Sequence, residues 1–379
     1  MGDEIVRVTI STVGVSLWRN NLDLEKAKIL MGRPASEMEQ FSSLINQLCD
    51  DTVRKVLYED FDPVTFSAET HSLYRIGVSE GDYAAFLTSD TLDGILCGKI
   101  LTGICKRKWK MEASYHVVKG LQVRDADMFR KEGVNHLVDQ IMHLLDKYPS
   151  SSYKVVLNPT GGYKAIVPYI TLMGLIEGIP VKYIYEQSKV LMELPVAPIS
   201  FNLDTIKDLG PVAADLATDY ITTDQFCEMM GANLYYLQQK FRDILYFEDG
   251  HVTLSALARL LYLRFLYKEG QQIELSKTVR KKLQQFPTWK NKFESLFEKM
   301  RNPLYRQAHI HNEVQSSRVD LDCFKQGNVA ERIFYFVEGE KVYICDIFLH
   351  DEYDRELNTG NLMKSKYMND FDVPVGIKV

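Results

Sequence analysis

The sequence predicts an α/β domain with a parallel sheet over residues 1–202, a helical connector over 203–275, and a small α+β domain with an antiparallel sheet over 276–379. Its 379 residues favour two or three domains rather than one. In the first part, strand-like and helix-like patterns alternate, which is typical of a parallel sheet with right-handed crossovers. After Phe201 strand patterns stop and helical ones take over, and the last part adds a meander of antiparallel strands to its helices.

The composition is that of an ordinary soluble globular protein, with 46% hydrophobic and 25% charged residues. A net charge of −6 argues against a chain that coats nucleic acid along its whole length. The six cysteines form neither a CxxC pair nor a zinc spacing, so we expect reduced thiols. No run is long enough to span a membrane, and the first residues are too acidic for a signal peptide. We therefore expect a cytoplasmic protein without a membrane partner.

The first predicted strand covers residues 5–10 and ends in Ser11-Thr-Val-Gly-Val-Ser16, a stretch of small hydroxyl residues around one glycine. Helical patterns follow near residues 37–48 and 52–58, and strand patterns lie at 81–89 and 114–118. A further helical pattern near 133–147 leads to the next strand, so the alternation expected of a parallel sheet continues.

The stretch 157–165 turns a predicted buried strand over 153–157 into a helical pattern through Gly161 and Gly162. Such a turn puts unpaired N–H groups and the positive end of a helix dipole at one spot, which favours a phosphate or another anion. Thr160 and Lys164 add a hydroxyl and a cation there. The spacing is not that of a P-loop, and a tight turn that needs glycine for a positive φ explains the same pattern.

Both glycine-bearing strand ends belong to the same predicted sheet. In parallel sheets, ligands bind beyond the carboxyl ends of the strands. The turns at Gly14 and Gly161 should therefore face one crevice, and their convergence favours a ligand site over two unrelated structural turns.

Four motifs in this part resemble those of the CARF domain, the Rossmann-like sensor of CRISPR defence: Ser11-Thr-Val-Gly, Ser67-Ala-Glu-Thr, Gly120-Leu and Asn158-Pro-Thr-Gly-Gly-Tyr-Lys. The resemblance covers roughly residues 1–202. It implies a homodimer with a cyclic oligoadenylate, expected to be cyclic tetra-adenylate, as allosteric activator, and no other cofactor. By position, it assigns contacts with the ring to Thr12, Gly14, Ser16, Glu69, Asn158, Thr160, Gly161, Gly162 and Lys164.

The segment 203–275 has amphipathic helical patterns that admit two interpretations. A winged-helix DNA reader would make the protein a ligand-controlled transcription regulator. However, the segment carries six Lys and Arg against eleven Asp and Glu, which is unfavourable for binding phosphates. We therefore expect a helical connector, and no DNA partner.

The segment 276–379 holds a cluster of cations in its first half and a predicted β-hairpin in its second. The hairpin strands, 332–337 and 342–349, place Arg332 opposite the chain that leaves the second strand through His350, Tyr353 and Arg355. Cations, an imidazole and a phenol at one spot suit attack of an RNA 2′-hydroxyl on its own phosphate, a reaction that needs no metal. Alternatively, Arg332 and Arg355 pair with neighbouring carboxylates on the surface.

Residues 280–360 resemble the RelE/HigB toxin superfamily of ribosome-dependent mRNA endonucleases, most clearly in Arg332-Ile-Phe-Tyr-Phe-Val-Glu-Gly and His350-Asp-Glu-Tyr-Asp-Arg355. The resemblance implies a RelE-like domain in which Arg332 opens the central strand and Tyr353 stacks on a base or moves a proton. It adds Arg318 and Lys325 as the basic side of the site. Asp351 and Glu352 precede the tyrosine, as in the HigB branch, so the general base is left open.

A CARF sensor joined to a RelE-like effector resembles the CRISPR-associated mRNA interferases. The combined resemblance implies an endoribonuclease of type III CRISPR-Cas antiviral defence that a cyclic oligoadenylate activates. Its expected partners are mRNA, the ribosome and a second copy of the chain.

A rival enzyme assignment uses Arg306 and His311, which satisfy the Arg, four residues, His pattern of HEPN ribonucleases. That pattern is short and arises easily by chance. HEPN domains are wholly helical, whereas strand patterns follow His311 here, so we favour the RelE-like interpretation.

Overall fold

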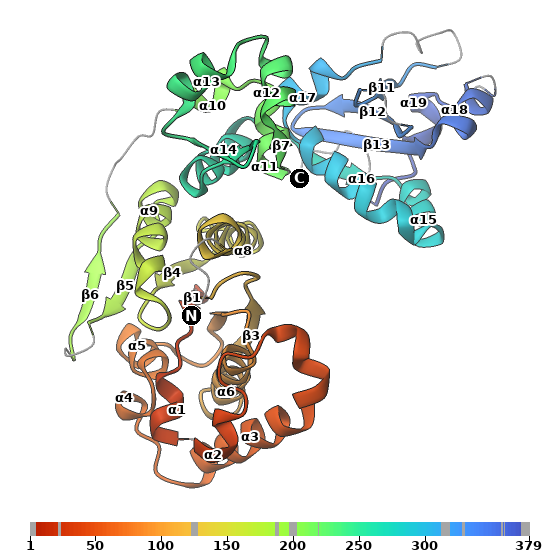
Figure 1. Cartoon of the computed structure of the whole chain (residues 1–379). Coiled ribbons are helices and arrows are strands. Elements are labelled where there is room, and N and C mark those ends of the chain that lie inside the picture. Colours follow the sequence, from red (N-terminus) through yellow and green to blue (C-terminus); the bar gives the residue numbers. More distant parts are fainter. Residues whose placement is uncertain are drawn as a thin grey trace. The chain divides into compact units, whose positions relative to one another are not determined.

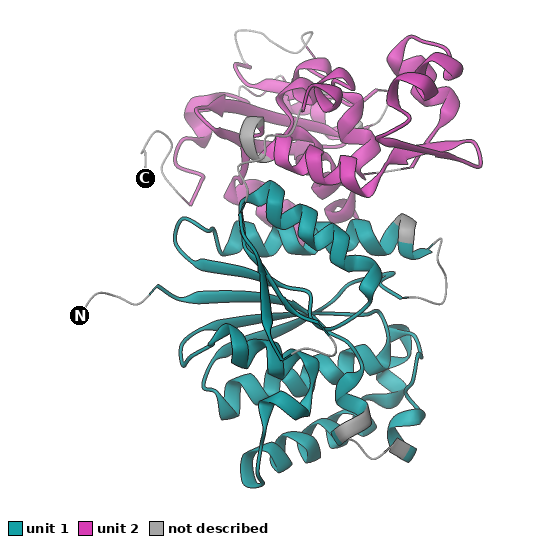
Figure 2. Cartoon of the chain, turned by 90° about the vertical axis from the view of Figure 1, so that its left-hand side faces the viewer, with its two compact units in different colours: residues 1–201 teal, residues 202–379 magenta. Residues whose placement is uncertain are grey.

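The structure is a computed structural model of the chain, and it divides into two compact units, Met1–Phe201 and Asn202–Val379 (Figures 1 and 2). It describes residues 5–21, 24–122, 128–185, 189–196, 203–218, 220–311, 319–327, 330–357, 359 and 361–372. The first unit corresponds to the predicted α/β domain. The second unit joins the predicted connector and the predicted α+β domain.

Unit 1 is built on a six-stranded sheet in the order β3-β2-β1-β4-β5-β6. The first five strands in this order pair in parallel and β6 is antiparallel to β5, so the prediction of a parallel sheet is confirmed for five of the six strands. The strands are β1 (Arg7–Thr12), β2 (Tyr83–Thr88), β3 (Glu112–Val117), β4 (Lys154–Asn158), β5 (Val181–Ile184) and β6 (Leu191–Leu194).

Helices cover both faces of this sheet (Figure 2). One large core lies where α3 and α6 pack against β2, since the buried apolar side chains of these three elements form a single cluster. The helices are α1 (Ser16–Asn21), α2 (Leu24–Lys28), α3 (Met38–Tyr58), α4 (Pro63–Phe66), α5 (Ala68–Ile76), α6 (Leu92–Lys108), α8 (Val134–Lys147) and α9 (Val167–Glu177), with short turns η1 (Ala35–Glu37), η2 (Phe129–Gly133) and η3 (Lys164–Ile166). The α3 helix merges the two predicted patterns near 37–48 and 52–58.

The first half of unit 2 contains strands, and the prediction that strands are absent after Phe201 is wrong. A three-stranded sheet in the order β7-β9-β8 consists of β7 (Ile221–Thr222), β8 (Leu245–Glu248) and β9 (His251–Leu254). The hairpin between β8 and β9 turns at Asp249 and Gly250, which both have positive φ, of 49° and 73°. Two such residues form the tight turn whose twist suits an antiparallel hairpin. The helices of this half are α10 (Asp204–Asp208), α11 (Val212–Thr218), α12 (Thr223–Met230), α13 (Leu234–Phe241) and α14 (Ala256–Glu269).

The second half of unit 2 holds a four-stranded sheet in the order β10-β13-β12-β11. β10 (Gln272–Leu275) runs parallel to β13 (Lys341–Phe348), whereas β11 (Asp322–Phe324), β12 (Arg332–Glu338) and β13 form the predicted antiparallel meander. Its helices are α15 (Lys277–Gln285), α16 (Pro287–Met300), α17 (Pro303–Ala308), α18 (His350–Glu356) and α19 (Lys364–Tyr367). One apolar core runs from Ile206 to Ile347 and includes side chains from both halves.

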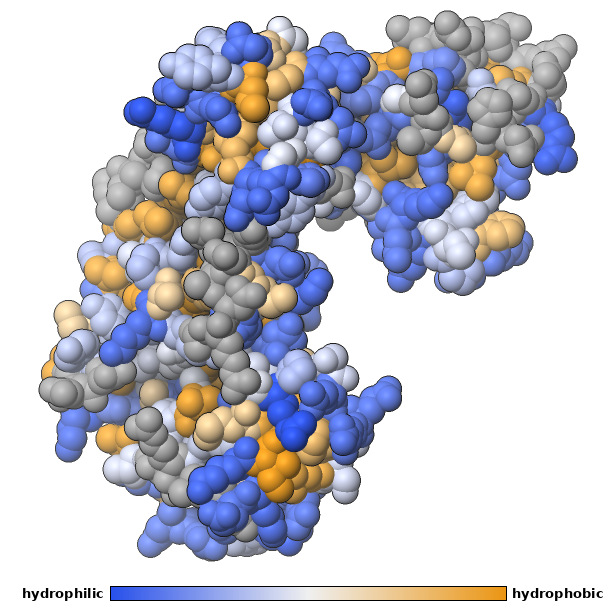
Figure 3. Space-filling view, viewed as in Figure 1, coloured by the Kyte–Doolittle hydropathy of each residue, from blue (hydrophilic) through white to orange (hydrophobic). Residues whose placement is uncertain are grey.

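The face shown in Figure 3 is largely hydrophilic, with apolar spots scattered over both units. Among the described helices, none combines the length and the apolar composition that crossing a membrane requires. All six cysteines are free thiols, and four of them are buried.

Candidate functional site

The two glycine-bearing turns of unit 1 lie in contact at the carboxyl edge of the sheet. β1 and β4 are parallel neighbours, with Ser11 level with Asn158, so the chain leaves both strands at the same height. A Cβ atom added to Gly14 would lie 2.7 Å from the backbone nitrogen of Gly162. The convergence expected from the sequence is therefore present, and only a residue without a side chain fits at Gly14.

The second turn also requires glycine, for two separate reasons. Gly162 has a φ of +90°, a conformation that strains residues with a side chain. A Cβ atom on Gly161 would lie 2.0 Å from Oε1 of Glu69, which leaves no space for it. The Thr12 hydroxyl donates a hydrogen bond to the Gly161 carbonyl oxygen and so fastens the turn to the end of β1.

Glu69 lies inside the protein, behind both turns. It stands in the first turn of α5, which begins with a capping box made by Ser67 and Thr70, and its side chain is 0% exposed. Its Oε1 accepts a hydrogen bond of 2.7 Å from the backbone N–H of Gly14. Burial raises the pKa of this carboxyl, while the bond from Gly14 opposes the shift. Glu69 was predicted to touch the ligand, but this location makes it a support for the turns.

Asn158 is a second internal support. Its side-chain amide donates hydrogen bonds to the hydroxyls of Ser11, at 3.0 Å, and Ser72, at 2.8 Å. Its Oδ1 accepts a bond of 2.6 Å from the Thr160 hydroxyl, and the Thr160 oxygen in turn accepts the N–H of Ile184, at 3.1 Å. These bonds connect β1, α5, β4 and β5 at one point.

The nine predicted residues thus fall into groups of different exposure. Gly162 and Lys164 are exposed, whereas Gly14, Ser16 and Thr160 are partly exposed. The four buried residues are Thr12, Glu69, Asn158 and Gly161. The surface of the site is therefore formed by glycine backbone, two hydroxyls and one ammonium group, which suits a ligand that carries phosphates.

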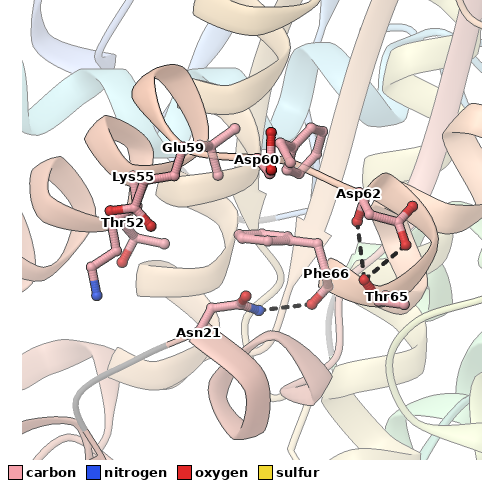
Figure 4. Close-up of a pocket in the computed structure, with 10 residues that line it drawn as sticks. Asn21, Thr52, Lys55, Glu59, Asp60, Asp62, Thr65 and Phe66 are labelled. Carbon is pink, nitrogen blue, oxygen red and sulfur yellow. Dashed lines mark hydrogen bonds between the residues drawn. The ribbon is translucent and has the colours of Figure 1, made fainter.

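A separate cavity of about 520 Å³ lies between the end of α3 and the start of α4 (Figure 4). Its wall is polar, and two of its side chains are already bonded locally: Asn21 donates to the Phe66 carbonyl, and Thr65 donates to Asp62. It is lined by Asn21, Thr52, Lys55, Val56, Glu59, Asp60, Phe61, Asp62, Thr65 and Phe66. None of the nine predicted residues is among them.

In unit 2, the structure brings Arg332 and Tyr353 together. Arg332 pairs in register with Phe348 at the open end of the β12–β13 hairpin, and Tyr353 follows in α18. The guanidinium carbon of Arg332 lies 5.3 Å from the centroid of the Tyr353 ring, which is within the range of a cation–π contact. Arg332 is only 3% exposed, and the Tyr353 ring is one of the groups that pack against the cation. We refer to these two residues as the Arg332–Tyr353 cluster.

The other predicted catalytic residues differ in how far the structure describes them. Arg355 is exposed in the last turn of α18, and Lys325 follows β11, where its backbone N–H bonds to the His309 carbonyl at 3.0 Å. His350 is the first residue of α18, but its side chain lies outside the described part of the chain. Arg318 also lies outside the described residues.

Arg306 and His311 do not form an exposed pair of arginine and histidine, which disfavours the HEPN alternative. Arg306 is 6% exposed, and its guanidinium donates to the Met300 carbonyl and to the Gln271 side chain. Desolvation lowers the pKa of this buried guanidinium. The chain after His311 forms β11, β12 and β13, whereas a HEPN domain would continue as helix.

A polar cluster next to Arg332 was missed in the sequence. Lys282 of α15 bonds to Asp346 of β13 at 2.6 Å, and its Nζ lies 3.7 Å from the centroid of the Phe348 ring. The Tyr367 hydroxyl donates to the other oxygen of Asp346 at 3.1 Å. Burial raises the pKa of Asp346, and Lys282 opposes this shift. The basic run around Lys282 was visible in the sequence, but its partner lies 64 positions away.

One comparison with known proteins supports the CRISPR assignment of part of unit 1. A family model described as "CRISPR-associated protein (Cas_APE2256)" matches residues 64–197, which include Glu69 and the turn at Gly161. No curated protein matches the chain.

Two similar solved structures have low scores. Can2 from Sulfobacillus thermosulfidooxidans, solved in complex with cyclic tetra-adenylate, is 10% identical, with a TM-score of 0.25 over 90% of this chain and 79% of its own. Protein VC1899 from Vibrio cholerae is 12% identical, with a TM-score of 0.27 over 90% of this chain and 76% of its own. The functional proposal for this chain rests on the family match and on the geometry of the two turns.

Proposed function

We propose that this protein is a ligand-activated ribonuclease of type III CRISPR defence. Unit 1 binds a cyclic oligoadenylate at the two glycine turns, and unit 2 cleaves mRNA on the ribosome at the Arg332–Tyr353 cluster. The observation that carries the proposal is the contact between the Gly14 and Gly162 turns. It lies at the edge of a parallel sheet where ligands bind, and its Gly162 turn falls within the segment that the CRISPR-associated family model matches.

The proposed ligand fits the chemistry of the turns. A ring of adenylates presents several phosphates, each of which needs donors and a compensating charge. Closely approaching glycine backbone, the partly exposed hydroxyl of Ser16 and the exposed Lys164 supply both. We further propose that the chain binds the ring as a homodimer, since a symmetric ring suits two copies of one site. Cyclic tetra-adenylate is the first ring to test.

The proposed cleavage uses the 2′-hydroxyl of the message as nucleophile. Arg332 offsets the negative charge that develops on the phosphorane, and a general base removes the proton from the 2′-hydroxyl. Tyr353 stacks on a base or moves a proton, and His350, Arg355, Arg318 and Lys325 are candidates for the remaining acid, base and cationic roles. The product would carry a 2′,3′-cyclic phosphate.

Access to Arg332 requires a conformational step in this proposal. The guanidinium is 3% exposed and lies against the Tyr353 ring, so a phosphate reaches it only after α18 shifts. α18 is a helix of seven residues at the open end of a hairpin, and such short peripheral elements open at low cost. Binding of the ring would favour the open state if that state has the higher affinity for it.

One observation favours a second candidate function, a ligand-controlled DNA-binding regulator. The order α11, β7, α12, α13 and the β8–β9 hairpin is that of a winged helix, and Tyr235 and Tyr236 are exposed on α13. The acidic excess over 203–275 disfavours phosphate binding, so we rank this candidate below the ribonuclease.

A translation extract tests the ribonuclease proposal. The protein is added with and without each cyclic oligoadenylate, and the message is mapped for breaks. We expect breaks only with one ring and only in messages that are being translated. Cleavage that needs no ring, or cleavage of naked RNA at the same rate, would contradict the proposed trigger or the ribosome dependence. Ring-dependent binding to a DNA library without RNA cleavage would favour the regulator.

A further inference from the structure

We propose that α15 and α16 form a docking surface for single-stranded RNA, and that the strand bound there is the message that leads into the Arg332–Tyr353 cluster. The inference rests on the proposed ribonuclease function and adds the surface that holds its substrate. We name this surface the basic face and define it by six cations: Lys277, Arg280, Lys281, Lys282, Lys290 and Lys292.

The basic face has an unusual charge for this protein. Residues 277–292 contain these six cations and no Asp or Glu, although the whole chain has an acidic excess. Five of the six are exposed, and Lys282 is partly exposed. A concentration of one sign of charge on adjoining helices attracts a polyanion irrespective of its sequence.

Four of the cations have carboxylate neighbours, but these contacts do not remove the positive charge of the basic face. Arg280 lies 3.5 Å from Asp372, Lys290 lies 4.0 Å from Glu294, and Lys292 lies 3.5 Å from Glu331. The Arg280 and Lys290 pairs are exposed on both sides, and such pairs contribute roughly 0–1 kcal/mol, so a phosphate can replace the carboxylate. The Lys282–Asp346 pair, at 2.6 Å, is better shielded and fixes the end of the basic face against β13.

An aromatic platform lies within the basic face, at the turn between the two helices. Phe286 and Trp289 are stacked, with ring centroids 4.8 Å apart and an interplanar angle of 23°. Phe286 is 43% exposed, so one aromatic ring is available to solvent beside the cations. Figure 3 shows mainly hydrophilic surface with apolar spots over this part of unit 2. Cations that follow a backbone, combined with a ring that stacks on a base, are the elements of single-strand recognition.

The basic face adjoins the Arg332–Tyr353 cluster from both helices, and this favours the message over ribosomal RNA. From α15, Lys282 lies over the ring of Phe348, the register partner of Arg332. From α16, Lys292 pairs with Glu331, whose carbonyl oxygen accepts a hydrogen bond of 2.9 Å from Arg332. Two cations of the basic face, Lys282 and Lys292, therefore contact immediate neighbours of Arg332, so a strand held there would lie beside the proposed cleavage site.

Binding of a labelled single-stranded RNA to the full chain tests the inference, with ring present; the free RNA should stay intact, because the proposed cleavage requires the ribosome. The triple variant Lys277→Gln/Arg280→Gln/Lys281→Gln should bind at least about tenfold more weakly at physiological salt. The slope of log affinity against log salt should fall by about 2, since each lost phosphate contact accounts for about 0.7. Phe286→Ala should weaken binding about tenfold through lost stacking and leave the slope unchanged.

The matched control is Lys106→Gln/Arg107→Gln/Lys108→Gln, which removes the same charges from the exposed end of α6 in unit 1. It should leave both affinity and slope unchanged. Equal losses in the control and the test variant would overturn the docking surface, and so would full RNA affinity in both. A test variant that keeps its RNA affinity but no longer associates with ribosomes would instead assign the basic face to ribosomal RNA. The proposed function fails separately, if the unchanged protein cleaves no message in the extract.

Discussion

In unit 1, the groups that face solvent at the candidate site are glycine backbone, hydroxyls and Lys164, and the carboxyl of Glu69 supports them from inside. In unit 2 the arrangement is reversed, because the cation of the proposed site, Arg332, is buried and lies against the ring of Tyr353. The first site can receive a ligand as it stands. In the proposed function, the second needs a movement of α18 before a phosphate can reach the cation, so we propose that recognition belongs to unit 1 and the regulated step to unit 2.

The largest expected effect concerns the preformed site. Gly162→Val should abolish detectable ring binding, because a side chain at a φ of +90° strains the turn and occupies its exposed face. Isothermal titration calorimetry measures this directly. Gly81→Val is the matched control, since Gly81 has a φ of +88° and open space around it, at the opposite edge of the sheet. Undiminished ring affinity in Gly162→Val, or equal loss in both variants, would contradict the site.

Arg332→Ala tests the occluded site. Loss of one preorganised donor to the phosphorane should slow cleavage about 10²–10³-fold, with ring affinity and dimerisation unchanged. Single-turnover cleavage of a translated message measures the rate. His311→Ala serves as the control and should cleave normally. The opposite pattern, with Arg332→Ala active and His311→Ala inactive, would place the active site in the HEPN-like motif.

Glu69 should affect stability in a pH-dependent way. Burial raises its pKa in the folded protein, so its contribution to stability is fully present below the unfolded value of about 4.5 and is lost as pH rises through the raised value. Glu69→Gln keeps an acceptor for the Gly14 N–H and should remove this pH dependence. Glu69→Ala leaves that N–H without its acceptor and should cost about 1–3 kcal/mol of unfolding free energy.

Urea unfolding at several pH values separates these effects. If unchanged protein and Glu69→Gln keep a constant stability difference from acid to neutral pH, Glu69 does not titrate as its burial implies.

Tyr353→Phe should have the smallest effect among these variants. The ring that lies over Arg332 remains, so cleavage should fall only slightly if the ring stacks on a base. A loss as large as that of Arg332→Ala would show that the hydroxyl moves a proton. The same cleavage assay, with Tyr353→Leu as a variant that removes the ring, distinguishes the two roles.

Local patterns explain what could be predicted from the sequence. Strand-helix alternation was enough to foresee the parallel sheet, and a hairpin brings Arg332 and Tyr353 together across only 21 positions. The β7–β9 sheet was missed because its strands have only two to four residues, although Asp249-Gly250 is a strong hairpin signal.

The burial of a given side chain, and the pairing of residues far apart in the chain, could not be predicted from the sequence. A motif match places Glu69 near the ligand but does not say that helix α5 turns its carboxyl inward. Likewise, no local sequence pattern indicates that Lys282 pairs with Asp346. None indicates that one hydrophobic core includes residues on both sides of position 275.

The most direct test of this account is hydrogen exchange of the α18 backbone in the full chain, with and without the activating ring. We predict faster exchange at residues 350–357 when the ring is bound, together with slower exchange around residues 160–164, the proposed ring site. The Gly162→Val variant should show neither change. Unchanged exchange in α18, under conditions where the ring is bound and cleavage is active, would contradict the claim that the ring opens the occluded site.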